Sequence, residues 1–359
     1  MAKRISVVVS QGQSQNPAKR NLEEEIVAGL LMEQGIDVTI VPHLYDLKSD
    51  STGILALQGI GSDVVVMSWL YPRAAHWLLD QNDVRGHFAE SQLKADDEAS
   101  ADDDGSDGAR DGNDKPRVTD ERETPNRKIY CISLKASDKP SDFIEETKRI
   151  ARDMTTQVVS LGDWVGGSPS SEQLNRFNNP TNDTALGNGN GKDKGPDKLL
   201  QPVRIEETGG RRWYPVIDFS RCTNCMECID FCLFGVYGVD AADTILVEQP
   251  DNCRKGCPAC SRVCPENAII FPQHKSPAIA GAAIDVAGLK IDLSKLFGAP
   301  DGGADAATIA ARERDEQLLL AGREAVGMDV GIPKRQAEQP ADSKDELDDL
   351  LDEFDELDL

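Results

Sequence analysis

Apolar residues near the start of the chain follow two alternating patterns. Short runs rich in Val and Ile are typical of buried strands, and they occupy residues 5–10, 36–44, 62–70 and 128–134. Stretches with apolar residues three and four positions apart are typical of helices that cover a sheet, and they occupy residues 21–35, 51–61, 72–81 and 141–154. Because strands that alternate with helices imply βαβ crossovers, the chain is predicted to begin with an α/β domain on a doubly wound parallel sheet.

Capping residues predict where the helices begin and end. Asn21 is expected to be the N-cap of the first helix, and Gly35 is expected to end it. Pro72 stands where a helix start tolerates proline, and Ser141 is the expected N-cap of the last of these helices.

Two segments interrupt the alternation. Residues 94–126 are acidic and nearly free of large apolar residues, so they cannot bury enough surface to offset the entropy of ordering the chain. They are predicted to be a disordered insertion within an α/β domain that spans residues 1–165. Residues 166–210 are rich in Gly, Asn, Ser and Pro, and they are predicted to be a flexible linker.

Eight of the nine cysteines follow this linker, in the runs CTNCMECIDFC and CRKGCPACSRVC. In runs of this spacing, three thiolates hold one iron–sulfur cluster and the fourth reaches the other cluster of a two-cluster protein. The predicted ligands of the first cluster are Cys222, Cys225, Cys228 and Cys264. The predicted ligands of the second cluster are Cys253, Cys257, Cys260 and Cys232.

Apolar runs at 213–219, 244–248 and 267–271 flank the two cysteine runs as predicted strands. With them, residues 211–274 resemble the bacterial-type two-cluster [4Fe-4S] ferredoxin domain. The resemblance implies a small α+β fold, two [4Fe-4S] clusters and electron transfer between protein partners. Leu233 follows the first run where the family usually has proline, and three residues instead of two separate Cys253 from Cys257.

Other uses of the cysteines compete with this hypothesis. Structural zinc usually takes two C-x2–4-C pairs separated by a longer gap, whereas each run here packs four cysteines closely. The second run also matches the three-cysteine signature of radical S-adenosylmethionine enzymes, which place it early in a large barrel domain. A disulfide scaffold needs an oxidising compartment. A purely structural role for the clusters is the remaining alternative.

The formal net charge of -24 opposes binding to nucleic acid or to an anionic membrane surface. It favours redox partners with a basic docking surface. No apolar run approaches the roughly 20 residues of a membrane span, and no signal peptide is evident, so a cytoplasmic protein is expected. The acidic residues that surround the cysteines are expected to favour the oxidised state of the clusters, and they are Asp218, Glu227, Asp230, Asp240, Asp243, Glu248, Asp251 and Glu266.

The loops that follow the predicted parallel strands form the place where such sheets bind ligands. Their candidate residues are Gln11, Gln13, Ser14, His43, Tyr45, Trp69, Tyr71 and Arg73. The domain resembles a flavodoxin-type fold, although the Ser/Thr-x-Thr-Gly phosphate loop of that family is absent. Two functions therefore stay open: an electron carrier or electron-transfer subunit, which we favour, and a flavin-linked oxidoreductase fed by the ferredoxin-like module. A scaffold role for the domain is a further alternative.

Three other features invite a functional hypothesis. Cys131, inside a predicted strand, is either a small buried apolar residue or a reactive thiol. His76 lies between Ala75 and Trp77 on a predicted helix, and these neighbours favour a packed residue over a metal ligand. Residues 275–359 are predicted to be mostly helical or disordered, and their tail at 345–359 carries a Leu and Phe stripe among carboxylates, typical of a docking segment or of a solubilising tail.

Overall fold

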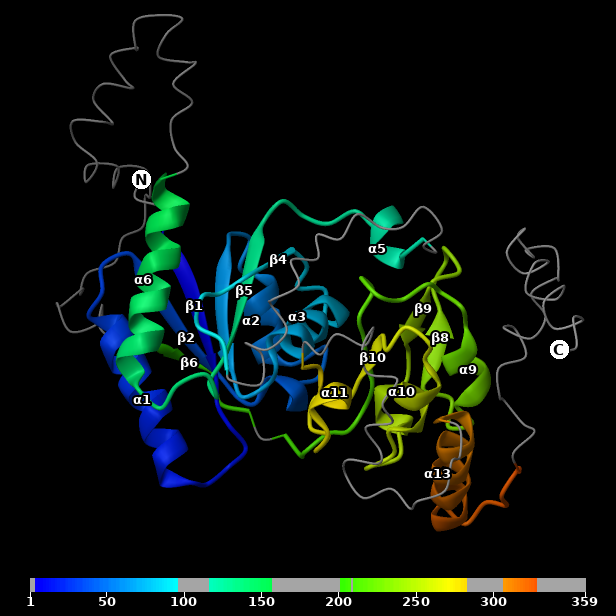
Figure 1. The fold of residues 1–359 in the computed structure, drawn as a ribbon. Coiled ribbons are helices and arrows are strands. Elements are labelled where there is room, and N and C mark those ends of the chain that lie inside the picture. Colours follow the sequence, from blue (N-terminus) through cyan, green and yellow to red (C-terminus); the bar gives the residue numbers. More distant parts are fainter. Residues whose placement is uncertain (1–3, 96–115, 157–200, 208, 283–305, 328–359) are drawn as a thin grey trace, which may run out of the picture.

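The computed structural model describes residues 4–95, 116–156, 201–207, 209–282 and 306–327 (Figure 1). Six parallel strands form the main sheet in the order β4-β5-β3-β1-β2-β6. The strands are β1 (Ile5–Ser10), β2 (Ile36–Val41), β3 (Val64–Ser68), β4 (His87–Ala89), β5 (Lys128–Ser133) and β6 (Val203–Arg204). The predicted parallel α/β domain is therefore confirmed.

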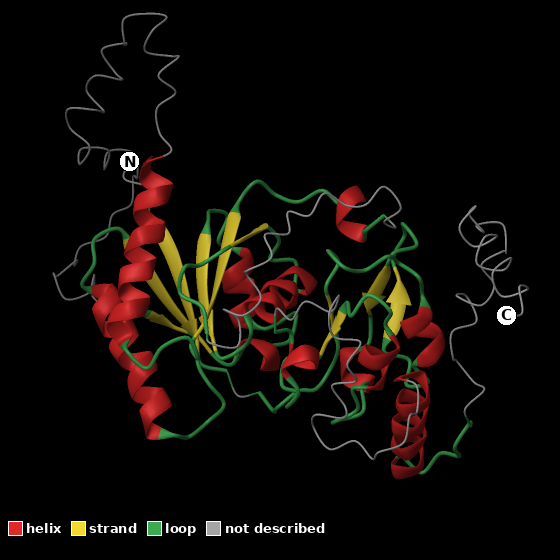
Figure 2. Cartoon of the chain, viewed as in Figure 1, coloured by secondary structure: helices red, strands yellow, loops and turns green. Residues whose placement is uncertain are grey.

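Helices cover both faces of this sheet, as Figure 2 shows. One face packs against α1 (Pro17–Leu31) and α6 (Pro140–Thr156), and the other packs against α2 (Thr52–Gln58), α3 (Pro72–Gln81) and the short η1 (Leu44–Asp46). Side chains of a strand alternate between faces, so Val7 and Val9 of β1 enter the first core while Val8 enters the second. None of the described helices is long and apolar enough to cross a membrane.

The first helix begins earlier than predicted. Asn16, and not Asn21, is its N-cap, because the Asn16 side chain accepts a hydrogen bond from the backbone N–H of Ala18. Pro17 then occupies the first helical position, where its missing N–H costs nothing. Gly35 lies in the turn that follows the helix, with a φ of +81° that suits glycine.

The cysteine-rich region forms a small α+β module. Its strands form two antiparallel pairs, β7 (Val216–Ile217) with β10 (Ile269–Ile270) and β8 (Tyr237–Val239) with β9 (Ile245–Val247). These strands confirm the predicted flanking runs. Its helical segments are α9 (Glu227–Phe231), η3 (Pro250–Asn252), α10 (Ala259–Val263) and α11 (Pro277–Ala280). The helix α13 (Ala306–Leu320) lies within residues 275–359, which were predicted to be mostly helical or disordered, and it packs against α10.

The module and the α/β domain share one hydrophobic core. Buried residues of the α3 side of the sheet, such as Val66 and Leu78, belong to the same cluster as Val216 and Ile270 of the module. Trp77 of α3 meets Phe219 edge-on, with ring centroids 5.9 Å apart. The module therefore lies beyond α3, on the side of the sheet opposite α1 and α6 (Figure 1).

Two described segments inside predicted disordered stretches carry regular structure. Within the predicted insertion 94–126, α5 (Val118–Glu121) lies against the module, where the backbone N–H of Val118 donates to the Cys222 carbonyl at 2.9 Å. Within the predicted linker 166–210, β6 pairs with β2. Both segments gain order from contacts with distant parts of the chain. Residues 96–115 of the insertion, most of the linker and the tail at 345–359 lie outside the described residues.

Candidate metal centre

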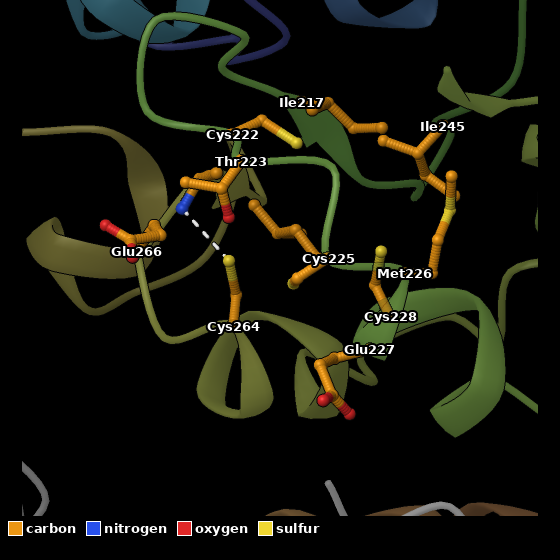
Figure 3. A pocket seen from close by; sticks show the side chains of 12 residues that line it. Ile217, Cys222, Thr223, Cys225, Met226, Glu227, Cys228, Ile245, Cys264 and Glu266 are labelled. Carbon is orange, nitrogen blue, oxygen red and sulfur yellow. Dashed lines mark hydrogen bonds between the residues drawn. The ribbon is translucent and has the colours of Figure 1, made fainter. Parts of the chain in front are cut away.

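The first cavity of the module is surrounded by four cysteines. Figure 3 shows Cys222, Cys225, Cys228 and Cys264 around one space. This space holds about 380 Å³, part of it open to solvent, and its walls include the apolar side chains of Ile217, Met226, Ile245 and Ile269. Three of the thiols come from the first run and one follows α10.

Local backbone conformation bends the first run around this cavity. Asn224 and Met226 both adopt positive φ, at 57° and 63°, between successive cysteines. Asparagine tolerates this left-handed region, whereas methionine does so at a cost. The Asn224 side chain also ties the run to the β8–β9 hairpin, because its Nδ2 donates to the Asp243 carbonyl and its Oδ1 accepts from the Ile245 N–H.

The second cavity is surrounded by the other four cysteines, Cys232, Cys253, Cys257 and Cys260. It holds about 340 Å³, again partly open to solvent. The additional residue of the second run is accommodated by Gly256, whose φ of +87° is a conformation that L side chains rarely adopt. Phe231, Phe234 and Val236 supply apolar walls.

The cysteines thus lie together in the two predicted sets, each with three members from one run and one from the other. The helices α9 and α10 pack against each other. Each carries one cysteine of its own run and is followed by a cysteine that lines the other cavity. In both, the backbone N–H of the later cysteine donates to the carbonyl four residues earlier, Cys232 to Cys228 and Cys264 to Cys260. One helical turn therefore directs successive cysteines to different cavities.

The donor chemistry of both cavities fits soft metal centres. Four thiols in an apolar wall are the ligand set that Fe–S clusters and zinc take. Among the described residues, no three His, Cys, Asp or Glu side chains lie close enough together to hold a single metal ion. Each set of four cysteines instead lines a cavity, which suits a cluster of several metal atoms better than a single ion.

Burial favours the neutral form of most of these thiols in the absence of a metal. It raises the pKa of Cys222 to about 11 and that of Cys257 to about 11, and it raises the pKa of Cys228 and Cys260 well above the ordinary value. The hydrogen bond from the Asn224 N–H to the Cys222 sulfur opposes the rise in the pKa of Cys222 only in part. Metal binding at these sites would therefore release protons.

Two residues that line or touch the second cavity were not predicted from the sequence. The Tyr237 hydroxyl donates to the Cys260 sulfur at 3.1 Å. Arg314 of α13 lines the same cavity and is 1% exposed. Tyr237 lies between the two cysteine runs and Arg314 stands fifty residues beyond the last cysteine, so no local pattern related either residue to the thiols.

The predicted ligand loops of the α/β domain are engaged in internal contacts. The Glu23 carboxylate accepts from the Gly12 N–H and from Trp69 Nε1, both at 2.7 Å. Gln13 donates to Asp46. The indole of Trp69 also lies close to Gly12, where an added Cβ would be 2.9 Å from the ring.

Other residues of these loops hold the cysteine module. The Tyr45 hydroxyl donates to the Tyr214 carbonyl and accepts from the Tyr214 N–H, and the two rings are stacked with centroids 4.4 Å apart. Arg73 forms a salt bridge with Asp218 and also donates to the Asn267 carbonyl at 2.7 Å. The carboxyl edge of the sheet is therefore a docking surface for the module.

Two known proteins are similar to parts of this chain. An uncharacterized ferredoxin of Methanocaldococcus jannaschii is 48% identical over 83 residues, which cover 22% of this chain and 56% of that protein. Ferredoxin-3 of Nostoc sp. is 31% identical over 80 residues, which cover 16% of this chain and 81% of that protein. The chain therefore belongs to the ferredoxin family, through a ferredoxin-like region that is joined to an N-terminal parallel α/β domain.

The chain spans 56% of the length of the Methanocaldococcus relative. No family model matches the chain. No solved structure matches it either.

Proposed function

We propose that the chain binds two [4Fe-4S] clusters and relays single electrons between redox partners. The observation that carries this proposal is the collection of eight cysteines into two sets of four around two separate cavities. The ligands of the first cluster would be Cys222, Cys225, Cys228 and Cys264, and those of the second would be Cys253, Cys257, Cys260 and Cys232. A cluster with four cysteine ligands leaves no iron position open for a substrate, and it supplies one-electron transfer when bound.

The residues around the thiols suit this role. Apolar side chains such as Ile217, Ile245 and Ile269 limit the access of water to the first cavity, and such a shell controls the redox potential of a metal centre. The net charge of -24 favours partners with a basic docking surface, because complementary charge accelerates their encounter.

The flavin-linked oxidoreductase receives less support from the described loops. A flavin phosphate would use free backbone N–H groups before α1, but the Gly12 N–H already donates to the Glu23 carboxylate. A second anion there would be repelled by that carboxylate. In our proposal the α/β domain instead positions the cysteine module for its partners, through contacts such as those of Tyr45 and Arg73.

Metal analysis of the anaerobically reconstituted chain tests the proposal directly. We expect about eight iron and eight sulfide per chain, four of each for every cluster. Electron paramagnetic resonance of the reduced protein should show two interacting centres. Stoichiometric zinc without sulfide would contradict the proposal.

Single cysteine variants test the crossed assignment of ligands. Cys232→Ala should remove or convert the cluster held by Cys253, Cys257 and Cys260, whereas Cys264→Ala should affect the other cluster. Cys131→Ala is the matched control, because Cys131 is buried in β5 and should leave both clusters in place. Loss of the cluster of its own run in Cys232→Ala would show that the assignment is wrong.

A further inference from the structure

The helix α13 brings a buried cation to the second cavity only. Arg314 is 1% exposed and lines the cavity, and its guanidinium lies 4.8 Å from the centroid of the Phe231 ring. Its Nη2 donates to the Gly327 carbonyl at 2.8 Å. The helix itself is held against the module by the salt bridge between Arg262 and Glu313, at 2.9 Å.

The two cavities differ in the charges of the residues that line them. Glu227 and Glu266 line the first cavity, and no basic residue does. Arg254 and Arg314 line the second cavity, and no acidic residue does. The acidic surroundings predicted for the whole cysteine region are therefore not shared equally between the cavities.

Neighbouring groups only partly offset this contrast. Arg314 forms a salt bridge with Asp315 at 3.2 Å, but the aspartate side chain is 16% exposed, so water screens its charge more than that of the buried arginine. In the first cavity, Figure 3 shows the Glu227 carboxylate turned away from the cysteine sulfurs, and Glu266 is paired with Arg117 at 2.7 Å. Two buried ionisable side chains, each 1% exposed, therefore contribute to the difference: Arg314 at the second cavity and Glu227 at the first.

A hydrogen bond to sulfur acts in the same direction. The Tyr237 hydroxyl donates to Cys260 in the second set at 3.1 Å. In the first set, the sulfurs of Cys222 and Cys264 accept longer bonds from backbone N–H groups, at 3.4 and 3.3 Å. Hydrogen bonds to the sulfurs and nearby charge are among the factors that set the potential of a cysteine-ligated cluster.

We propose that Arg314 and Tyr237 make the second cluster site more oxidising than the first, so that an electron held by the chain resides mainly at the second site. The inference rests on the proposed function. One-electron reduction adds a negative charge at the site, and a buried cation and a hydroxyl donor stabilise that charge. Arg314 thus acts through its positive charge, which stabilises the reduced form of the second site. It is contributed by a helix that begins after the ferredoxin-like range 211–274 ends.

A redox titration of the full chain, followed by electron paramagnetic resonance, tests this inference. In Arg314→Gln, the equilibrium constant for sharing an electron between the two sites should shift about tenfold toward the first site, equivalent to 59 mV for a one-electron couple. The potential of the first site should stay unchanged. Tyr237→Phe should give a smaller shift in the same direction, and Arg314→Lys should restore most of the original difference.

Arg312→Gln is the matched control, because it removes the same charge from an exposed position on the same helix. The inference would be overturned if the second site had the same potential in Arg314→Gln as in the wild-type chain. It would also be overturned if Arg312→Gln shifted that potential as much as Arg314→Gln does. Iron and sulfide are counted in every variant. If Arg314→Gln loses the second cluster, Tyr237→Phe decides, and an unchanged potential of the second site in Tyr237→Phe would overturn the inference. A chain that takes up no iron and sulfide at all would instead refute the proposed function.

Discussion

At the scale of single residues, His76 shows what burial does to a titratable side chain. It is 5% exposed on α3, between the rings of Trp77 and Phe88. Burial lowers its pKa to about 4, and the opposing effects of Asp80 and Asp218 do not compensate. The prediction of a packed residue is confirmed by this burial.

His76 should make the protein less stable in acid. Between pH 6.5 and 4 the unfolded chain binds a proton at this residue and the folded chain does not. The contribution of His76 to the free energy of unfolding is therefore fully present above about pH 6.5, and it is lost as the pH falls from 6.5 to 4. The full loss is about 3 kcal/mol, at 1.36 kcal/mol for each pKa unit. In His76→Gln, denaturant unfolding between pH 7 and 5 should show a shallower dependence on pH.

His87→Gln serves as the control for this prediction, because His87 is exposed on β4. The free energy of unfolding of His87→Gln should depend on pH nearly as steeply as that of the wild-type chain. Equal slopes for His76→Gln and His87→Gln would show that acid sensitivity arises elsewhere.

At the scale of elements, the start of α1 is decided by the pair Asn16 and Pro17. The apolar pattern begins at Leu22, and it therefore indicated a cap close to that residue. The first turn of the helix is exposed or half-buried and carries no apolar pattern, so the pattern could not locate the true cap. Proline at the first helical position was the available signal.

Substitution of the two asparagines distinguishes these caps. Asn16→Ala should lower the free energy of unfolding by about 1 kcal/mol, because the N–H of Ala18 loses its acceptor. Asn21→Ala should be neutral or slightly stabilising, since it places a better helix former at an exposed helical position. Chemical denaturation of both variants is the measurement, and a larger loss in Asn21→Ala would contradict the observed cap.

At the scale of the whole molecule, one continuous core joins the α/β domain to the cysteine module. Polar contacts reinforce it, among them the salt bridge between Arg73 and Asp218, whose side chains are 12% and 1% exposed. A shared core of this kind favours a single cooperative unfolding transition. The α/β domain and the module are therefore expected to unfold together.

Arg73→Met should break this coupling. It leaves the buried Asp218 carboxylate without its main cation, and removal of one partner of a buried pair costs about 3–5 kcal/mol. Addition of Asp218→Asn should recover part of the loss, because the unpaired charge is then gone. Thermal unfolding followed by near-UV circular dichroism and by cluster absorbance would report the two regions separately.

Arg4→Met is the control, since its salt bridge with Asp37 is exposed and such pairs contribute about 0–1 kcal/mol. If Arg73→Met cost no more than Arg4→Met, the buried salt bridge would not be what couples the two regions.

The sequence by itself determined the features that depend on neighbouring residues. Alternation of apolar runs indicated four of the six strands of the parallel sheet, β1, β2, β3 and β5, and the helices between them, since burial of one face acts over a few residues. It did not indicate β4 or β6. The spacing of the two cysteine runs placed Cys232 and Cys264 in the opposite sets, where the cavities have them. Burial of Cys131 likewise followed from its position inside an apolar strand.

Only the tertiary structure decided how distant segments meet. Arg73 reaches Asp218, Val118 reaches Cys222 and Arg314 reaches the second cavity across separations that no local pattern encodes. The same holds for β6, which is ordered by its pairing with β2 although its own composition is that of a linker. The physical reason is that propensity and periodicity are local, whereas these contacts depend on the path of the whole chain and on the core that two regions share.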